Sequence, residues 1–168
     1  MALLTIREIG DPILNKKAKT VKEMTPRLKE LVQDMLETMY ESNGVGLAAP
    51  QVGVLKRIVV IDVSPEQNDP HVFINPQIVE ATGEQEGYEG CLSIPGKSGW
   101  VKRPQYVKTV AYDENMNQFE VEGVDLFARC MCHEFDHLDG ILYVEKAEGG
   151  LIDNEELERA EEEEAQKE

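Results

Sequence analysis

His133-Glu134-Phe135-Asp136-His137 is the stretch of sequence around which the rest of the chain can be interpreted. It lies within residues 125–139, whose apolar periodicity predicts a helix with Asp125 as a candidate N-cap and Gly140 at its end. Side chains four residues apart share one face of a helix, so both imidazoles can reach one cation while Glu134 stands beside it. The stretch uses two of only three histidines in the chain. It therefore predicts a metal-binding helix.

The helical wheel of residues 125–139 places both histidines in its apolar arc. At about 100° per residue, Leu126 and Cys130 share that arc. Three polar residues define the side expected to face water: Arg129, Asp136 and Asp139. A single histidine in an apolar arc is more often a packed core residue than a ligand, but a pair with a glutamate between them favours metal ligation.

Two imidazoles are too few for a catalytic metal, which commonly takes three protein ligands and leaves a position for water. Downstream candidates for the third ligand are Glu145 and Glu148, and upstream candidates are His71 and Cys91. Cys91 lies in the segment EGCLS (89–93), a glycine-bounded turn after an expected strand. A thiolate with two imidazoles suits iron(II), zinc or cobalt and excludes magnesium and calcium.

The segment GVGLAAPQ (44–51) is a third block of interest. Its glycines and alanines let the backbone come close to a bound chain. Gln51 offers a side-chain N–H suited to a developing oxyanion. By composition alone, the segment also fits a tight turn followed by a strand of small residues, and it lacks the Lys-Ser/Thr ending of a phosphate-binding loop.

The flanking sequence predicts an α+β fold, with mixed or antiparallel short strands around the metal-binding helix and an amphipathic helix near the N-terminus. The amphipathic helix should begin at Thr25 as N-cap with Pro26 as its first residue. Asn43 and Gly44 should end it, with Gly44 in the left-handed conformation. Residues 6–14 should form an extended arm. Strands are expected at 57–63, 72–74, 78–81, 106–112 and 118–121, the last two as a hairpin.

Length and charge place further bounds on the protein. The 168 residues suit a single metallohydrolase domain at 1–150 followed by an acidic tail at 151–168, helical or disordered. The formal net charge is -16, which disfavours direct nucleic-acid binding except at a local basic patch. No apolar run is long enough for a membrane span and the start lacks a secretory signal, so a cytoplasmic protein is expected. Three cysteines argue against a disulfide scaffold.

Three blocks together, GVGLAAPQ, EGCLS and HEFDH, resemble the peptide deformylases. IREIGDPIL and HLDG are similar to the same family, so the resemblance covers about residues 6–144. It implies a metal-dependent hydrolase that removes the formyl group from N-formylmethionyl nascent peptides and releases formate. Hydroxide on the metal would attack the formyl carbon, with Glu134 as general acid/base.

The resemblance also implies roles for individual residues. Cys91, His133 and His137 would bind one divalent metal ion, with Fe2+ expected and Zn2+, Ni2+ or Co2+ as alternatives. Gln51 and the backbone N–H of Leu92 would hold the oxyanion. The remaining implied roles are contacts to the substrate: backbone contacts from Gly46, and a methionine-sized pocket beside Val45, Tyr88, Leu126 and Cys130.

The sequence departs from the family in three places. Cys132 precedes His133 where many relatives have Gln, and both Cys130 and Cys132 read as packing residues on their own. No arginine closely follows EGCLS, where the nearest bases are Lys97, Lys102 and Arg103. The tail is acidic where some relatives carry a basic helix, which argues against RNA contact by this tail. The resemblance allows a monomer with a transient ribosome association.

Two other functions fit the same residues. One is an endopeptidase of the zincin type, with a downstream glutamate as the third ligand. The other is a structural metal module or acidic binding domain without turnover.

Overall fold

The computed structural model describes residues 2–167; Met1 and Glu168, the outermost residues of the expected domain and tail, lie outside the described residues. The α-helices are α1 (Pro26–Glu41), α2 (Asp125–Leu138) and α3 (Asn154–Gln166). Short 3-10 helices are η1 (Pro12–Asn15), η2 (Ala49–Val52) and η3 (Tyr143–Glu145). The strands are β1 (Gly46–Ala48), β2 (Ile58–Ile61), β3 (His71–Thr82), β4 (Gln85–Cys91), β5 (Ile94–Arg103), β6 (Tyr106–Tyr112), β7 (Gln118–Val124) and β8 (Glu148–Asp153).

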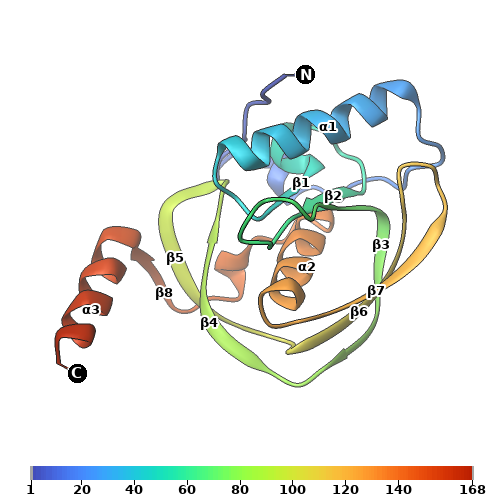
Figure 1. The fold of residues 1–168 in the computed structure, drawn as a ribbon. Coiled ribbons are helices and arrows are strands. Elements are labelled where there is room, and N and C mark those ends of the chain that lie inside the picture. Colours follow the sequence, from blue (N-terminus) through green and yellow to red (C-terminus); the bar gives the residue numbers. More distant parts are fainter. Residues whose placement is uncertain (1, 168) are drawn as a thin grey trace.

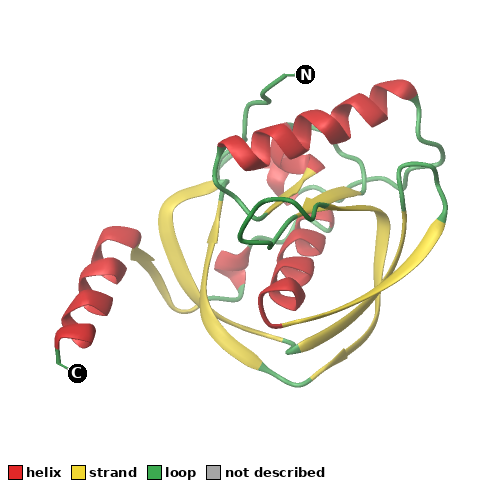
Figure 2. Ribbon diagram, viewed as in Figure 1, coloured by secondary structure: helices red, strands yellow, loops and turns green. Residues whose placement is uncertain are grey.

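The strands form two antiparallel sheets on either side of α2. The larger sheet has the order β1-β2-β3-β6-β7, and the smaller has the order β4-β5-β8. Figure 1 shows α2 in the middle, with β4 and β5 on one side, β3, β6 and β7 on the other, and α1 above. Figure 2 shows the same enclosure as strands around one central helix. The predicted α+β fold with a central helix is confirmed.

Helix α1 begins as predicted and ends differently. The Thr25 hydroxyl accepts a hydrogen bond from the backbone N–H of Leu28 at 3.2 Å, and Pro26 is the first helical residue. At the other end Asn43, with φ 56°, takes the left-handed conformation that was predicted for Gly44. Asparagine tolerates this conformation better than most residues. Gly44 instead allows Leu92 to pack closely, because a Cβ there would lie 2.7 Å from Leu92 Cδ1 and the leucine side chain would have to shift.

Several strands differ from their predicted form. The two strands expected at 72–74 and 78–81 are parts of β3, which passes Pro76 through a register shift between Ile74 and Gln77. A bulge accommodates a proline that cannot donate to the ladder. The β6–β7 hairpin is as predicted. The arm at 6–14 also contains part of η1, because the Asp11 side chain caps it.

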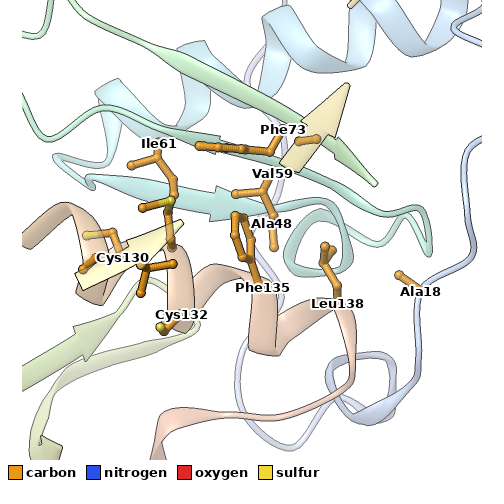
Figure 3. Packing of buried hydrophobic residues seen from close by; sticks show 13 residues of the cluster. Ala18, Ala48, Val59, Ile61, Phe73, Cys130, Cys132, Phe135 and Leu138 are labelled. Atoms are coloured by element: carbon orange, nitrogen blue, oxygen red, sulfur yellow. The ribbon is translucent and has the colours of Figure 1, made fainter. Parts of the chain in front are cut away.

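The hydrophobic core between α2 and the larger sheet fixes the central helix. Phe135 on α2 packs edge-on against Phe73 of β3, with ring centroids 5.3 Å apart. Figure 3 shows this contact together with Val59, Ile61 and Leu138. Burial of each such side chain contributes about 1.5–3 kcal/mol. Because α2 is buried on most of its surface, its polar residues are held in a fixed geometry.

The tail segment lies at the edge of the molecule. Strand β8, which contains the expected boundary at residue 150, pairs with Lys97 to Trp100 of β5. Helix α3 follows and buries none of its side chains. In Figure 1 it projects at the end of the fold opposite to the start of α1. None of the helices in residues 2–167 has the length and hydropathy needed to cross a membrane.

Candidate active site

Cys91, His133 and His137 meet at one point between the two sheets. Cys91 is the last residue of β4, and both histidines project from α2. One potential ligand atom from each residue lies within 4.8 Å of those from the other two. Cys91 Sγ lies 3.4 Å from His137 Nε2. The imidazole rings are 5.1 Å apart at 71°, so they converge without stacking.

The other candidates for a third ligand lie elsewhere. His71 packs against Phe127, with ring centroids 4.8 Å apart, and reaches toward Asp69. The Glu145 carboxylate accepts from the backbone N–H of Leu142 at 3.0 Å. The Glu148 carboxylate lies 3.6 Å from Lys102 Nζ. Only Cys91 among the proposed third ligands joins the two histidines in the described part of the chain.

Glu134 lies beside this cluster and is buried. Its Oε1 has no hydrogen-bond partner within residues 2–167 and lies 4.0 Å from His137 Nε2. Burial raises the pKa of Glu134 to about 7, an effect that the positive charge of His133 only partly offsets. On its other side is Gly46 of β1, where a Cβ would lie 2.5 Å from Glu134 Oε2. The absence of a side chain at position 46 is what gives the carboxylate its place.

The Gln51 amide is fixed with its N–H groups toward the thiol. Its Oε1 accepts from the backbone N–H of Ala48 at 2.9 Å. Its Nε2 then donates to Ser93 Oγ at 3.0 Å and lies 3.5 Å from Cys91 Sγ. Because the carbonyl end is already bonded, the amide nitrogen must face the cluster. The sequence-predicted Gln51 and Cys91 therefore lie together.

Glu89 is a buried residue at this site that was not predicted. Its Oε1 lies 2.7 Å from His133 Nδ1, and its carboxylate also receives two hydrogen bonds from Arg103, at 2.8 and 2.9 Å. Arg129 Nη1 donates to the same carboxylate at 2.7 Å. Burial raises the pKa of Glu89, but the hydrogen bonds from Arg103 and His133 outweigh it, so that the net shift is downward. Alternation along β4 could have indicated Glu89, because it precedes Cys91 by two residues.

The placement of Arg129 corrects the helical-wheel prediction. It was expected to face water but is only 8% exposed. Its guanidinium is buried because the Glu89 carboxylate compensates for the loss of water. Arg129 precedes His133 by one helical turn, so both donate to the same carboxylate. The N-cap prediction at Asp125 also fails, because Val124 is the N-cap and Asp125 lies in the first turn.

The two histidines respond in opposite ways to their surroundings. Burial lowers the pKa of His133, but the negative charges of Glu134, Cys91 and Glu89 outweigh it and raise the pKa to about 10. His137 has no such compensation, and burial together with the charge of His133 holds its pKa well below its ordinary value. The surroundings therefore keep His137 neutral, which is the form in which an imidazole nitrogen can bind a metal.

A cleft of about 360 Å³ opens next to the cluster. It brings together five of the predicted site residues: Val45, Gly46, Cys91, Leu92 and Glu134. The cleft is also lined by Asn43, Gly44, Gly90, Ile94, Pro95, Gly96, Lys97 and Asn154. Three other predicted pocket residues do not line this cleft: Tyr88, Leu126 and Cys130.

Each of these three has a different surrounding. Tyr88 is exposed and packs edge-on against Trp100, with ring centroids 5.0 Å apart. Leu126 is 47% exposed on the first turn of α2, although the wheel placed it in the apolar arc. Cys130 is buried in the core cluster, and Cys132 lies there too, as predicted for packing residues. Burial raises the pKa of the Cys130 thiol and raises that of Cys132 to about 11.

The residues present fit a transition-metal ion. Glu89 occupies His133 Nδ1, which leaves the other ring nitrogen for a ligand bond. One sulfur and two imidazoles are the donors that iron(II), zinc, nickel and cobalt accept. The unpartnered Glu134 oxygen lies at the edge of this donor set, where a bound water could reach it. The arrangement can bind a cation and can also move a proton.

Comparison of the chain with known proteins points to a single family. The sequence pattern of the family described as polypeptide deformylase matches residues 3–150. A peptide deformylase of Agathobacter rectalis is 63% identical over 153 residues, which cover 91% of this chain and 95% of the relative. A peptide deformylase of Lachnoclostridium phytofermentans is 63% identical over 149 residues, 89% of this chain and 91% of the relative.

Solved structures show the same likeness. The crystal structure of a peptide deformylase from Legionella pneumophila superposes with a TM-score of 0.85 at 42% identity, and the match covers 88% of each chain. That of a peptide deformylase from Synechococcus elongatus in complex with actinonin superposes with a TM-score of 0.82 at 40% identity, covering 95% of this chain and 85% of the other.

Proposed function

Because this chain belongs to the polypeptide deformylase family and removes the N-terminal formyl group from nascent peptides, we propose that Cys91, His133 and His137 hold its metal ion while Glu134 transfers the protons. The observation that carries this assignment is the convergence of the three donor atoms within 4.8 Å. A divalent cation bound there supplies Lewis acidity, which lowers the pKa of water and polarises a carbonyl oxygen.

Glu134 is suited to move protons in both directions. A general acid/base works best when its pKa lies near the operating pH, and burial raises that of Glu134 to about 7. As carboxylate it takes a proton from the attacking water. As carboxylic acid it gives a proton to the nitrogen that leaves when the C–N bond of the formamide breaks. The products are formate and a peptide with a free amino group.

The developing oxyanion needs hydrogen-bond donors that are already in place. We assign this role to the Gln51 side-chain N–H and the backbone N–H of Leu92. The Gln51 amide is oriented by Ala48, and its Nε2 donates one hydrogen to Ser93 Oγ and directs the other toward the thiol of the cluster. Loss of one such donor typically costs about 3 kcal/mol of transition-state stabilisation.

Substrate contacts are assigned to the cleft and to one face of α2. Gly46 offers backbone contacts and Val45 an apolar side chain, and both line the cleft. Leu126 and Cys130 precede Glu134 at intervals of four on α2, which places them on the face that carries the acid/base. We propose that these two residues and Tyr88 of β4 bound the methionine side chain of the substrate.

The proposed native metal is Fe2+, with Zn2+, Ni2+ and Co2+ as ions that the same donors accept. A thiolate-ligated ferrous ion should be sensitive to oxygen. Metal analysis after anaerobic purification, beside analysis after purification in air, tests this assignment. Zinc at full occupancy in both preparations, with full activity, would contradict it.

Formate release from a formyl-Met tripeptide tests the residue assignments. Glu134→Gln should abolish formate release while the protein retains its metal. Cys91→Ser should lower metal content far more than Cys130→Ser, which removes a buried thiol outside the donor set. Equal metal content in the two cysteine variants would exclude Cys91 as a ligand. An internal peptide bond should not be cleaved.

We propose that the enzyme acts in the cytoplasm as a monomer. Its substrates are nascent peptides, and all residues of the proposed site come from one chain. Light scattering of the metallated protein at assay concentration tests the oligomeric state, for which a stable dimer would contradict the proposal.

A further inference from the structure

A groove at the start of α1 carries the positive charge that the rest of this acidic protein lacks. The groove is lined by Lys19, Thr20, Val21, Lys22, Glu23, Thr25, Leu28 and Lys56. Along the chain, residues 16–29 contain Lys16, Lys17, Lys19, Lys22, Arg27 and Lys29 against the single acid Glu23. We refer to Lys19, Lys22 and Lys56 as the basic groove.

The cations of this region are free, whereas those elsewhere are mostly paired. Arg7, Arg57, Lys97, Lys102, Arg103, Lys108, Arg129 and Lys146 all lie within 4.0 Å of a carboxylate. In the described part of the chain, the bases without such a partner are Arg159 and Lys167 of the tail segment, Lys56, and the six of residues 16–29. A free cluster of this size in a chain of net charge -16 calls for an external anion.

The local structure holds like charges together. Lys19 and Lys56 are paired in an isolated parallel bridge, with the backbone N–H of Arg57 donating to Lys19 O at 3.0 Å. Like charges on paired residues repel each other and lower stability. The first turn of α1 contains Arg27 and no acidic residue, although helix starts favour negative charge. Both features place positive charge where the fold supplies no acidic partner, and a bound polyanion would supply one.

The segment that carries Lys19 and Lys22 is anchored to the rest of the fold by hydrogen bonds. Asn75 makes two hydrogen bonds at 2.8 Å to the backbone N–H and C=O of Val21. The backbone N–H of Ala18 donates to Leu138 O at 2.8 Å. The charges are therefore presented on an ordered backbone, and binding need not order a loop.

The acidic tail and the catalytic cleft lie away from the basic groove. Figure 1 shows α3 and the beginning of α1 at opposite ends of the molecule. Repulsion from the tail is screened over a Debye length of about 8 Å at physiological salt. Thr25 at one end of α1 borders the groove, and Asn43 beyond the other end borders the cleft. The 16 residues of α1 between the two ends span about 24 Å, so an occupant of the groove leaves the cleft open.

We propose that the basic groove docks the enzyme on the phosphate backbone of structured RNA. Nascent peptides are presented by a particle whose surface is rich in RNA, and a string of phosphates matches spaced lysines better than a single small anion does. The net charge of the chain disfavours direct nucleic-acid binding except at a local basic patch, and the basic groove is such a patch. The proposal concerns a surface outside the catalytic cleft, so RNA binding and formate release can fail independently.

The test measures binding of a short RNA duplex by fluorescence anisotropy as a function of salt. Three lysine–phosphate contacts predict a roughly 40-fold weakening between about 50 and 200 mM salt. The groove variant is K19Q/K22Q/K56Q. The matched control, which removes the same charge elsewhere, is K108Q/R159Q/K167Q. The groove variant should reduce the slope of log affinity against log salt by about three, and the control should leave it nearly unchanged.

Several outcomes would overturn the proposal. The first is a wild-type protein that does not bind the duplex at about 50 mM salt. The second is a groove variant that binds like the control while both have the same thermal stability. The third is equal, lysine-dependent binding to phosphatidylserine vesicles or polyglutamate, which would make the groove a site for other polyanions. Formate release from a free formyl-Met tripeptide should be the same in the wild type and in both variants.

Discussion

Glu89→Gln preserves the shape of the side chain but removes the negative charge that holds Arg103, Arg129 and His133. Glu89 and Arg103 are 5% and 4% exposed, so water cannot replace the lost partner. Removal of one partner from a buried ion pair typically costs about 3–5 kcal/mol, because the other charge remains buried and uncompensated. The glutamine N–H2 group would also face donors on at least one side, because its carbonyl can replace only one carboxylate oxygen.

Guanidinium denaturation of the metal-loaded protein measures this loss of unfolding free energy, and thermal unfolding measures the accompanying change in melting temperature. For a chain of this length, a 3–5 kcal/mol loss lowers the melting temperature by roughly 6–20 °C. Glu89 also fixes the ring of His133 through Nδ1, and loss of such a partner typically weakens metal binding about 10–100-fold. Competition with a chelator should show that shift.

The matched control is Glu86→Gln on the same strand. The Glu86 side chain is 43% exposed and its carboxylate lies 3.7 Å from Lys102 Nζ. An exposed pair of this kind contributes at most about 1 kcal/mol. If Glu89→Gln and Glu86→Gln unfold at the same denaturant concentration and retain metal equally well, the Glu89 carboxylate does not organise the site.

Three further substitutions test other parts of the structure. Gly46→Ala places a Cβ 2.5 Å from the Glu134 carboxylate. It should lower kcat for formate release at least about tenfold with metal retained, because a misplaced acid/base loses most of its contribution. An unchanged kcat would refute this. Thr25→Ala removes the cap of α1 and should cost about 1 kcal/mol in denaturant unfolding without changing formate release. Asp62→Asn removes a buried carboxylate. Burial raises the pKa of Asp62, but hydrogen bonds from Ser64 and Tyr40 lower that pKa by more, so the net shift is downward. The stabilisation by the ionised carboxylate is complete above the unfolded pKa of about 3.9 and is lost as the pH falls through the folded pKa. The difference in unfolding free energy between wild type and variant should therefore be about 1–3 kcal/mol at pH 7 and should disappear in acid. A difference that does not change with pH would contradict this.

The parts of the fold that follow local rules could be predicted from the sequence. Helix α1 has a cap, a first-turn proline and an apolar stripe, and helix α2 has the spacing of four that unites its histidines. A strand was expected before Cys91 without bounds, and β5 was not predicted, because glycines and charged residues lower the intrinsic preference of both segments for strand. They exist because they pair with each other across a long hairpin, which is a non-local interaction.

The same distinction applies to the site. The two histidines could be recognised from spacing alone, whereas Cys91 was one of several candidates for the third ligand until the family resemblance selected it. Arg129 was placed on the wrong side of its helix because the wheel assigns a charged residue to water. Its burial depends on Glu89, which lies forty positions earlier in the chain. A partner at that separation has no local signature.

Helix α2 contributes to stability and chemistry at the same time, and this shapes how its variants must be interpreted. Its Phe135 and Leu138 are part of the main core, while His133 and His137 are candidate metal ligands and Glu134 lies beside them. Any substitution that shifts the helix changes both. Glu89 lies on β4 and its carboxylate bonds to Arg129 and His133 of α2, so a change there alters the charge next to the helix without removing a core side chain. The contrast between Glu89→Gln and a core substitution such as Leu138→Ala, which costs about 2–5 kcal/mol through a cavity, can therefore separate loss of metal from loss of fold.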